Sequence, residues 1–160
     1  IIESYVLALN EKGISVENIY DAAFVMRQFS KHVDIDDKTH LVDTCGTGGD
    51  GIQTFNVSTL SAIVAASAGV KVAKHGGRSV SSKCGSADVL EALGVNVNLT
   101  PERVVLLVNE IGIAFMFAPN FHPAMRYAAP VRKKLGVRTI FNVRPPCQSS
   151  LSHASSIRCL

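Results

Sequence analysis

A glycine-rich segment, residues 45–51, is the first place in this chain of 160 residues where the residue types suggest chemistry. It reads CysGlyThrGlyGlyAspGly, and AsnValSerThr at 56–59 follows it as the start of a helix. Glycines let backbone N–H groups approach an anion closely, and a helix N-terminus adds oriented donors and a favourable dipole. The segment therefore predicts a phosphate site, whereas the alternative is a tight strand-to-helix turn without a ligand.

A basic segment, residues 74–83, reads LysHisGlyGlyArgSerValSerSerLys. Lys74, Arg78 and Lys83 bring three cations, and the hydroxyl donors are Ser79, Ser81 and Ser82. These groups suit a multiply charged phosphate or diphosphate. Alone, the segment would be interpreted as a solvated basic loop. Beside the glycine-rich segment, we expect it to form the second half of one divided anion site.

A third segment, PheAlaProAsnPheHisProAlaMetArg at 117–126, supplies aromatic surface, and Arg132 supplies a cation beyond it. Its prolines are expected to shape the loop and to start or kink helices. For His122 and Met125, packing is the simpler interpretation, and we assign neither a catalytic role.

The elements that position these segments follow from apolar periodicity. Residues 1–31 are expected to form two helices, the second capped by Ser15, with one apolar face made of Val16, Ile19, Ala23 and Met26. From residue 41 onward, short apolar runs alternate with helical stretches. The expected strands are Leu41–Asp43, Lys71–Ala73, Val95–Leu99, Ile113–Phe117 and Arg138–Phe141. The expected helices begin near Ser58, Ser86, Pro101 and Pro123, with stops at Gly69, Gly94, Gly112 and Gly136.

This alternation predicts an α/β fold: a mostly parallel sheet with flanking helices, preceded by part of a small helical domain. Ligands of such sheets bind at the carboxyl ends of the strands, so the loops after Asp43, Ala73 and Phe117 are the expected site. We predict a partial helical domain at 1–36 and an incomplete α/β domain at 37–143. A non-native or disordered tail is expected at 144–160.

Composition narrows the function classes. With 47% hydrophobic and 18% charged residues, the chain has the composition of a folded domain, and a net charge of +3 does not favour a nucleic-acid or membrane-surface binder. No apolar run approaches the ~20 residues that span a bilayer, so we expect no membrane partner. The cysteines, which lack the spacing of a zinc site or a disulfide framework, indicate a reducing cytoplasm; they are Cys45, Cys84, Cys147 and Cys159.

Taken together, four motifs resemble the anthranilate phosphoribosyltransferases over residues 1 to about 143. They are DTCGTGGDG at 43–51, FNVST at 55–59, KHGGRSVSSKCGSADVLEALG at 74–94 and FAPNFHPAMRYAAPVRKKLGVRTIFN at 117–142. Enzymes of this family transfer the phosphoribosyl group from phosphoribosyl diphosphate to the amine of anthranilate, with magnesium, and release diphosphate. The reaction is the second step of tryptophan biosynthesis.

The resemblance implies which residues bind which ligand. Ser58 would also touch magnesium, and Gly46, Gly77 and Arg132 would face anthranilate. No protein nucleophile is implied, because positioning and electrostatics suffice. A cytoplasmic enzyme that is a homodimer in its full-length form is also implied, with no nucleic-acid partner. The residues expected around phosphoribosyl diphosphate are Gly46, Gly49, Asp50, Thr54, Asn56, Val57, Ser58, Thr59, Lys74, His75, Gly76, Gly77, Arg78, Ser79, Val80, Ser81, Ser82 and Ser86.

Two features depart from the family pattern. Gly77 stands where the family has an Asn that contacts anthranilate, so one amide hydrogen bond is lost. The Ser-rich tail at 144–160 replaces the LGPLxNP loop and the later AspGlu pair that binds magnesium. Codons for this tail, read one nucleotide later, can encode GlyProLeuValAsnPro. We therefore predict a frameshift near the codons for Val143 and Arg144 and a truncated chain, which the DNA sequence would test.

Two alternatives remain open at this point. A pyrimidine nucleoside phosphorylase resembles the fold and also handles ribose and phosphate, but the LysHisGlyGlyArgSer motif fits it less well; phosphorolysis of thymidine or uridine would identify it. A non-catalytic nucleic-acid-binding paralogue would need a clustered basic face. Here the cations concentrate in the expected phosphate loops.

Overall fold

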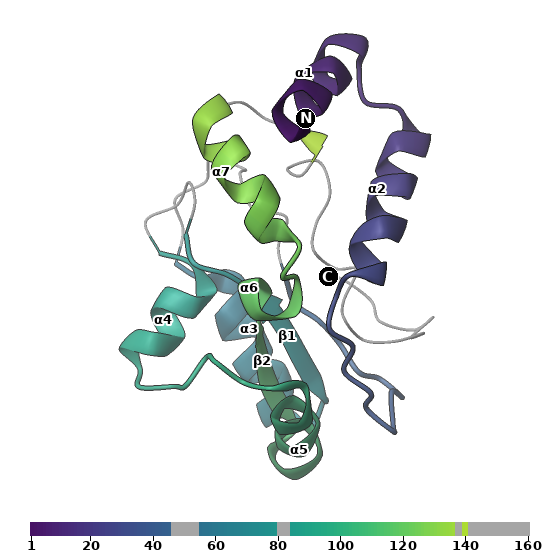
Figure 1. The fold of residues 1–160 in the computed structure, drawn as a ribbon. Coiled ribbons are helices and arrows are strands. Elements are labelled where there is room, and N and C mark those ends of the chain that lie inside the picture. The colour runs from purple at the N-terminus through teal and green to yellow at the C-terminus, as the bar shows by residue number, and fades with distance from the viewer. Residues whose placement is uncertain (46–54, 80–83, 137–138, 141–160) are drawn as a thin grey trace.

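The computed structural model describes residues 1–45, 55–79, 84–136 and 139–140. The elements are α1 (Ile2–Lys12), α2 (Val16–Gln28), α3 (Val57–Ser67), β1 (Val72–Gly76), α4 (Ser86–Ala92), α5 (Pro101–Ile111), β2 (Ile113–Phe117), α6 (Ala118–Phe121) and α7 (Met125–Leu135). Helices α1, α2 and α7 lie apart from the sheet, and α3, α4, α5 and α6 lie close to it (Figure 1). Within these described residues, no helix is long and apolar enough to cross a membrane.

The two strands are parallel, in a register that runs from Val72 opposite Ile113 to Gly76 opposite Phe117. On the other side of β1, Val42 forms an isolated parallel bridge with Val72. Helices α3 and α5 lie on opposite faces of this sheet (Figure 1). The observed class is therefore mixed α/β with parallel pairing and flanking helices, as the sequence predicts.

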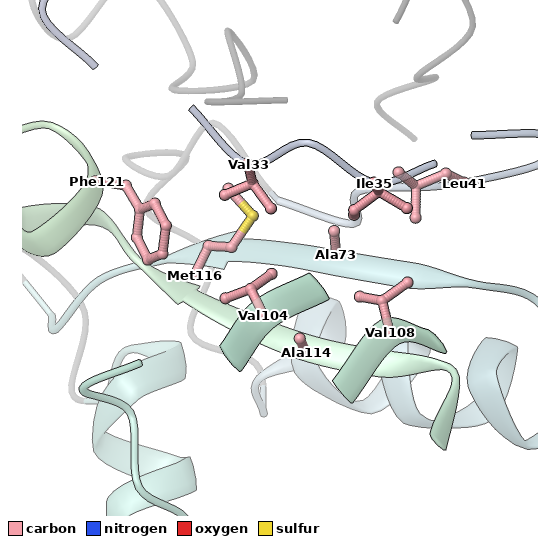
Figure 2. Close-up of a cluster of buried hydrophobic side chains, with 9 residues drawn as sticks. All are labelled: Val33, Ile35, Leu41, Ala73, Val104, Val108, Ala114, Met116 and Phe121. Carbon is pink, nitrogen blue, oxygen red and sulfur yellow. The ribbon is translucent and has the colours of Figure 1, made fainter. Parts of the chain in front are cut away.

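The larger core cluster lies between the sheet and α5 (Figure 2). From α5, Val104 and Val108 face the small side chains Ala73 and Ala114, which let the helix approach the strands closely. This packing holds α5 on the face of β1 opposite to α3. The cluster is completed by Val33, Ile35, Leu41, Met116 and Phe121.

Most helix boundaries agree with the sequence prediction. The Ser15 hydroxyl accepts a hydrogen bond from Asn18 N–H, while the Asn18 side chain accepts one from Ser15 N–H, and these two bonds cap α2. The predicted apolar face of α2 is only partly covered, because Ala23 is buried while Val16 is exposed. The four predicted stop glycines all have positive φ angles: Gly69 (87°), Gly94 (79°), Gly112 (77°) and Gly136 (60°).

The strand predicted at Val95–Leu99 is wrong. These residues have no regular secondary structure, because Asn96 accepts a hydrogen bond from Asn98 N–H at 2.9 Å and closes a local turn. Val97 is the residue of this run that is buried, so the side chains do not alternate into a core as a strand requires.

Two further boundaries differ. β1 runs to Gly76, three residues beyond the predicted end at Ala73, so Lys74 and His75 belong to the strand. Helix α6, which begins with Ala118 and Pro119, was not expected. Of the strand predicted at Arg138–Phe141, the structure describes Thr139 and Ile140, and neither is in a strand; the predicted tail at 144–160 lies outside the described residues.

Candidate functional site

The first part of the candidate site is the N-terminus of α3, which Asn56 caps. Asn56 Oδ1 accepts hydrogen bonds from Thr59 N–H at 3.1 Å and from the Ser58 hydroxyl at 3.3 Å. The Ser86 hydroxyl, at the start of α4, lies 3.5 Å from the same oxygen. One amide oxygen therefore joins the starts of two helices that are about thirty residues apart in sequence.

A buried cation points at this helix start. Lys74, on β1, is 2% exposed, and its Nζ donates to Ser58 Oγ at 3.1 Å. The Thr44 hydroxyl donates to the main-chain carbonyl of Ser58 at 2.8 Å, which ties the end of the first predicted strand to α3. The positive end of the α3 dipole and the Lys74 ammonium thus lie together, which is an arrangement that favours an anion.

A buried carboxyl lies behind these groups. Asp43 Oδ1 accepts hydrogen bonds from Cys45 N–H at 2.9 Å and from His75 N–H at 3.0 Å. Burial raises the pKa of the Asp43 carboxyl, although these two hydrogen bonds and the nearby Lys74 ammonium act in the opposite direction. Asp43 was not among the predicted site residues; the available signal was an acidic residue that ends an apolar run.

The structure also brings two histidines together. The rings of His75 and His122 lie edge to face with centroids 4.8 Å apart, and no described group bonds to any of their ring nitrogens. Burial lowers the pKa of His75 to about 3, with smaller contributions from His122 and Lys74. Burial also lowers the pKa of His122. Both rings are therefore neutral at neutral pH, and His122, for which packing was the expected role, lies against a predicted site residue.

The basic segment is tied to α4. Arg78 makes a bidentate ion pair with Glu91, at 3.2 and 2.6 Å, and lies 4.9 Å from the centre of the Phe117 ring. Asp88 Oδ2 accepts hydrogen bonds from Ser79 N–H at 2.9 Å and from Gly85 N–H at 2.8 Å. These contacts hold residues 77–79 against the beginning of α4, next to Ser86.

The glycines of this region have different roles. A Cβ at Gly76 would lie 3.0 Å from the Phe115 ring and 3.1 Å from Ser86 Cβ, so the bare backbone allows β1 to approach α4. A Cβ at Gly77 would meet nothing within 4 Å. Packing therefore does not require glycine at the position where the family pattern has Asn.

Not every predicted site residue is placed by the structure. Val57 belongs to α3, but its side chain is exposed on an apolar surface away from the polar cluster. Arg132 belongs to α7, and its side chain lies outside the described set. The described residues that come together are Asn56, Ser58, Thr59, Lys74 and Ser86. The predictions outside the described residues are Gly46, Gly49, Asp50, Thr54, Val80, Ser81 and Ser82.

Ser58 is the residue that the resemblance assigns to magnesium. Mg²⁺ is commonly held by one or two protein oxygens together with water and substrate phosphates. In the part of the chain that the structure describes, no group of three His, Cys, Asp or Glu side chains could hold a metal ion. The single neutral hydroxyl of Ser58, beside a lysine ammonium, fits an ion that is carried mainly by a diphosphate.

Comparison with known proteins places this geometry in a family. Residues 38–157 match the family model described as glycosyl transferase family, a/b domain. The anthranilate phosphoribosyltransferase of Chromobacterium violaceum is 63% identical over 140 residues, which are 88% of this chain and 41% of that protein. The chain thus spans about two fifths of the length of this curated relative.

Two solved structures are similar in fold. The anthranilate phosphoribosyltransferase from Thermus thermophilus superposes with a TM-score of 0.84 at 47% identity, covering 93% of this chain and 45% of that one. The anthranilate phosphoribosyltransferase from Saccharomyces cerevisiae, in complex with PRPP and Mg, gives a TM-score of 0.86 at 36% identity, with 95% and 43% covered.

Proposed function

Since the chain belongs to the glycosyl transferase family, we propose that it forms the phosphoribosyl diphosphate-binding part of an anthranilate phosphoribosyltransferase. The complete enzyme would transfer the phosphoribosyl group to the amine of anthranilate and release diphosphate. The observation that carries the proposal is the Lys74 ammonium at the N-terminus of α3, bonded to Ser58 Oγ and beside the Asn56 cap. The relatives' names and the PRPP and Mg complex of the yeast protein support it.

The proposed mechanism relies on electrostatics and positioning. Breaking the anomeric C–O bond develops positive charge on the ribose and additional negative charge on the departing diphosphate. Lys74 and the positive end of the α3 dipole stabilise that negative charge, because they are already oriented before the reaction. Bound Mg²⁺, touched by Ser58, would supply further neutralisation of the diphosphate. The amine needs only to be held in line with the anomeric carbon, so no protein nucleophile is required.

The remaining site assignments are part of the proposal. For phosphoribosyl diphosphate, we propose as binding residues the full set expected from the sequence, both those that the structure describes and those outside the described ranges. On the anthranilate side we propose Gly46, Gly77 and Arg132. We further propose that the complete protein is a cytoplasmic homodimer, and exposed aromatic side chains on α2, such as Tyr20 and Phe24, support an interface there.

A matched pair of lysines tests the proposal. Lys74→Met removes the buried cation, whereas Lys71→Met removes a cation whose Nζ bonds Asp37 at 2.8 Å outside the site. Titration calorimetry with phosphoribosyl diphosphate and Mg²⁺ should show binding to the wild-type chain. A loss of about tenfold or more in affinity is expected for Lys74→Met, because charge-assisted bonds to phosphate are strong, and little change is expected for Lys71→Met. Absence of wild-type binding, or equal effects of both variants, would reject the proposal.

A further inference from the structure

The Asp43 carboxyl connects the main chain of the two segments that form the candidate site. Asp43 is fully buried, and its Oδ1 accepts from Cys45 N–H and from His75 N–H. Cys45 opens the glycine-rich segment, and His75 belongs to the basic segment. One carboxylate oxygen therefore holds the main chain at Cys45 and at His75, each at hydrogen-bond distance.

The local hydrogen-bond pattern explains why a side chain does this. Val42 N–H donates to Lys71 C=O, and Ala73 N–H donates to Val42 C=O, each at 3.0 Å, as in a parallel ladder. The next donor of β1 is His75 N–H, which in a regular ladder would reach the carbonyl of Thr44. It bonds to Asp43 Oδ1 instead. The carboxylate thus continues the ladder at the point where the main chain turns away.

The turn itself depends on the same oxygen. Cys45 N–H bonds to the side chain two residues before it, which is the pattern of an Asx turn. The main-chain positions of Cys45 and of His75 are therefore set by one group.

The cost of burying Asp43 argues against a role in packing alone. Its second oxygen, Oδ2, is buried and has no hydrogen-bond partner among the described residues. A buried acceptor without a partner makes the folded chain less stable, and an apolar side chain would fill the same space without that cost. The carboxyl is better explained by what its other oxygen holds in place.

We propose that Asp43 is a positioning residue of the diphosphate site, which fixes the distance between the main chain at Cys45 and at His75. The inference rests on the proposed function. Lys74 lies next to His75 on β1, so the hydrogen bond at His75 also sets where Lys74 lies relative to the main chain at Cys45. Asp43 itself contacts main chain and not ligand.

Three variants test this inference. Asp43→Ala removes the acceptor, and Asp43→Asn keeps a side-chain oxygen of the same length. Val108→Ala is the matched control, because it removes buried packing on α5 and bonds to neither Cys45 nor His75. The readouts are residue-resolved amide exchange by NMR, the affinity for phosphoribosyl diphosphate with Mg²⁺, and the melting temperature. Ala73 N–H, which bonds to Val42 C=O, is the internal reference for exchange.

In Asp43→Ala, the amides of both Cys45 and His75 should exchange about tenfold faster or more relative to Ala73, and affinity should fall by about tenfold or more. Asp43→Asn should retain most of both properties. Val108→Ala should lower the melting temperature without changing the affinity of the folded chain. If Asp43→Ala does not fold, Asp43→Ser replaces it, with the same expected loss of affinity because its shorter side chain cannot hold both amides.

Several results would overturn the inference. Faster exchange with unchanged affinity in Asp43→Ala would mean a structural role alone, and faster exchange at one amide alone would remove the two-sided connection. Equal losses of affinity in Asp43→Ala and Val108→Ala would also mean that Asp43 has a structural role alone. A wild-type chain that does not bind phosphoribosyl diphosphate rejects the proposed function, and the positioning role with it. Binding to the wild type with equal binding to Asp43→Ala rejects the positioning role alone.

Discussion

Gly85 is the residue of the site region with the least room for a side chain. A Cβ there would lie 2.4 Å from Ser79 N and 2.6 Å from the carbonyl carbon of Arg78, and both are backbone atoms. We predict that Gly85→Ala destabilises the chain by about 1–3 kcal/mol, the usual cost of overpacking. Gly77→Ala is the control, because its Cβ would meet nothing within 4 Å, and it should change stability by less than about 0.5 kcal/mol. Urea unfolding measures both, and similar values would contradict the prediction.

His75 predicts a dependence of stability on pH. Its folded-state pKa is lowered from 6.5 to about 3 by burial, so the unfolded ring takes up a proton at a higher pH than the folded ring. The stabilisation is therefore present above pH 6.5 and is lost as the pH falls from 6.5 towards 3. His122, whose pKa burial also lowers, acts in the same direction, while Asp43, whose pKa burial raises, acts in the opposite one.

His75→Gln removes one of these protons. In denaturant unfolding, the free energy of unfolding should decrease as the pH is lowered from 7 to 5. The decrease should be at most about 1.4 kcal/mol per pH unit for each proton involved. The slope should be shallower in His75→Gln. An unchanged slope would mean that His75 is accessible to protons in the folded chain.

At the scale of the elements, local signals were sufficient for helix ends and for β2, which has the predicted bounds Ile113–Phe117, but not for every strand. Ser15 and the stop glycines act through their own backbone neighbours, so their effect can be predicted from sequence. Val95–Leu99 has the apolar content of a strand, but no strand among the described residues pairs with it, and Asn96 closes a turn within it. Pairing with a distant partner decides whether such a run becomes a strand, and a single sequence does not contain that information.

Thr100 gives a prediction at the same scale. Its hydroxyl accepts a hydrogen bond from Arg103 N–H at 3.4 Å and caps α5, the helix that covers one face of the sheet. Thr100→Ala should reduce the free energy of unfolding by about 1 kcal/mol, while Thr100→Ser should stay close to the wild type. Thermal and urea unfolding provide the comparison. A loss of the same size in both variants would assign the effect to the threonine methyl group.

At the scale of the whole molecule, contacts between residues distant in sequence decide which part of the candidate site could be predicted. The two segments with phosphate-binding composition were found from sequence, and the structure brings their described residues Ser58 and Lys74 into contact. Asp43 was not predicted as a site residue. It acts through the main chain of His75, which is distant from it in sequence, and the parallel pairing beside Val42 and Val72 brings the two together. Composition marks residues that can bind a ligand, but it does not mark residues that hold other residues in place.

The outer face of α3 carries the last prediction. This helix contains no charged residue, and Leu60 and Val64 are 49% and 60% exposed beside a hollow of about 350 Å³ that Phe55 also lines. An exposed apolar helix face is normally covered, so this face should drive self-association of the chain. We predict that Leu60→Lys with Val64→Lys lowers the average sedimentation coefficient of the chain in sedimentation velocity, because it removes association through α3 and leaves the proposed α2 interface intact.

Ile111→Lys is the matched control for this face, because Ile111 is an exposed apolar residue of α5, on the opposite side of the sheet. It adds a positive charge without altering α3, and it should leave the association unchanged. Equal shifts in the α3 variant and the control would mean that added charge, and not the α3 face, governs association. A wild-type chain that is monomeric at all concentrations would show that this apolar face does not bind a second copy.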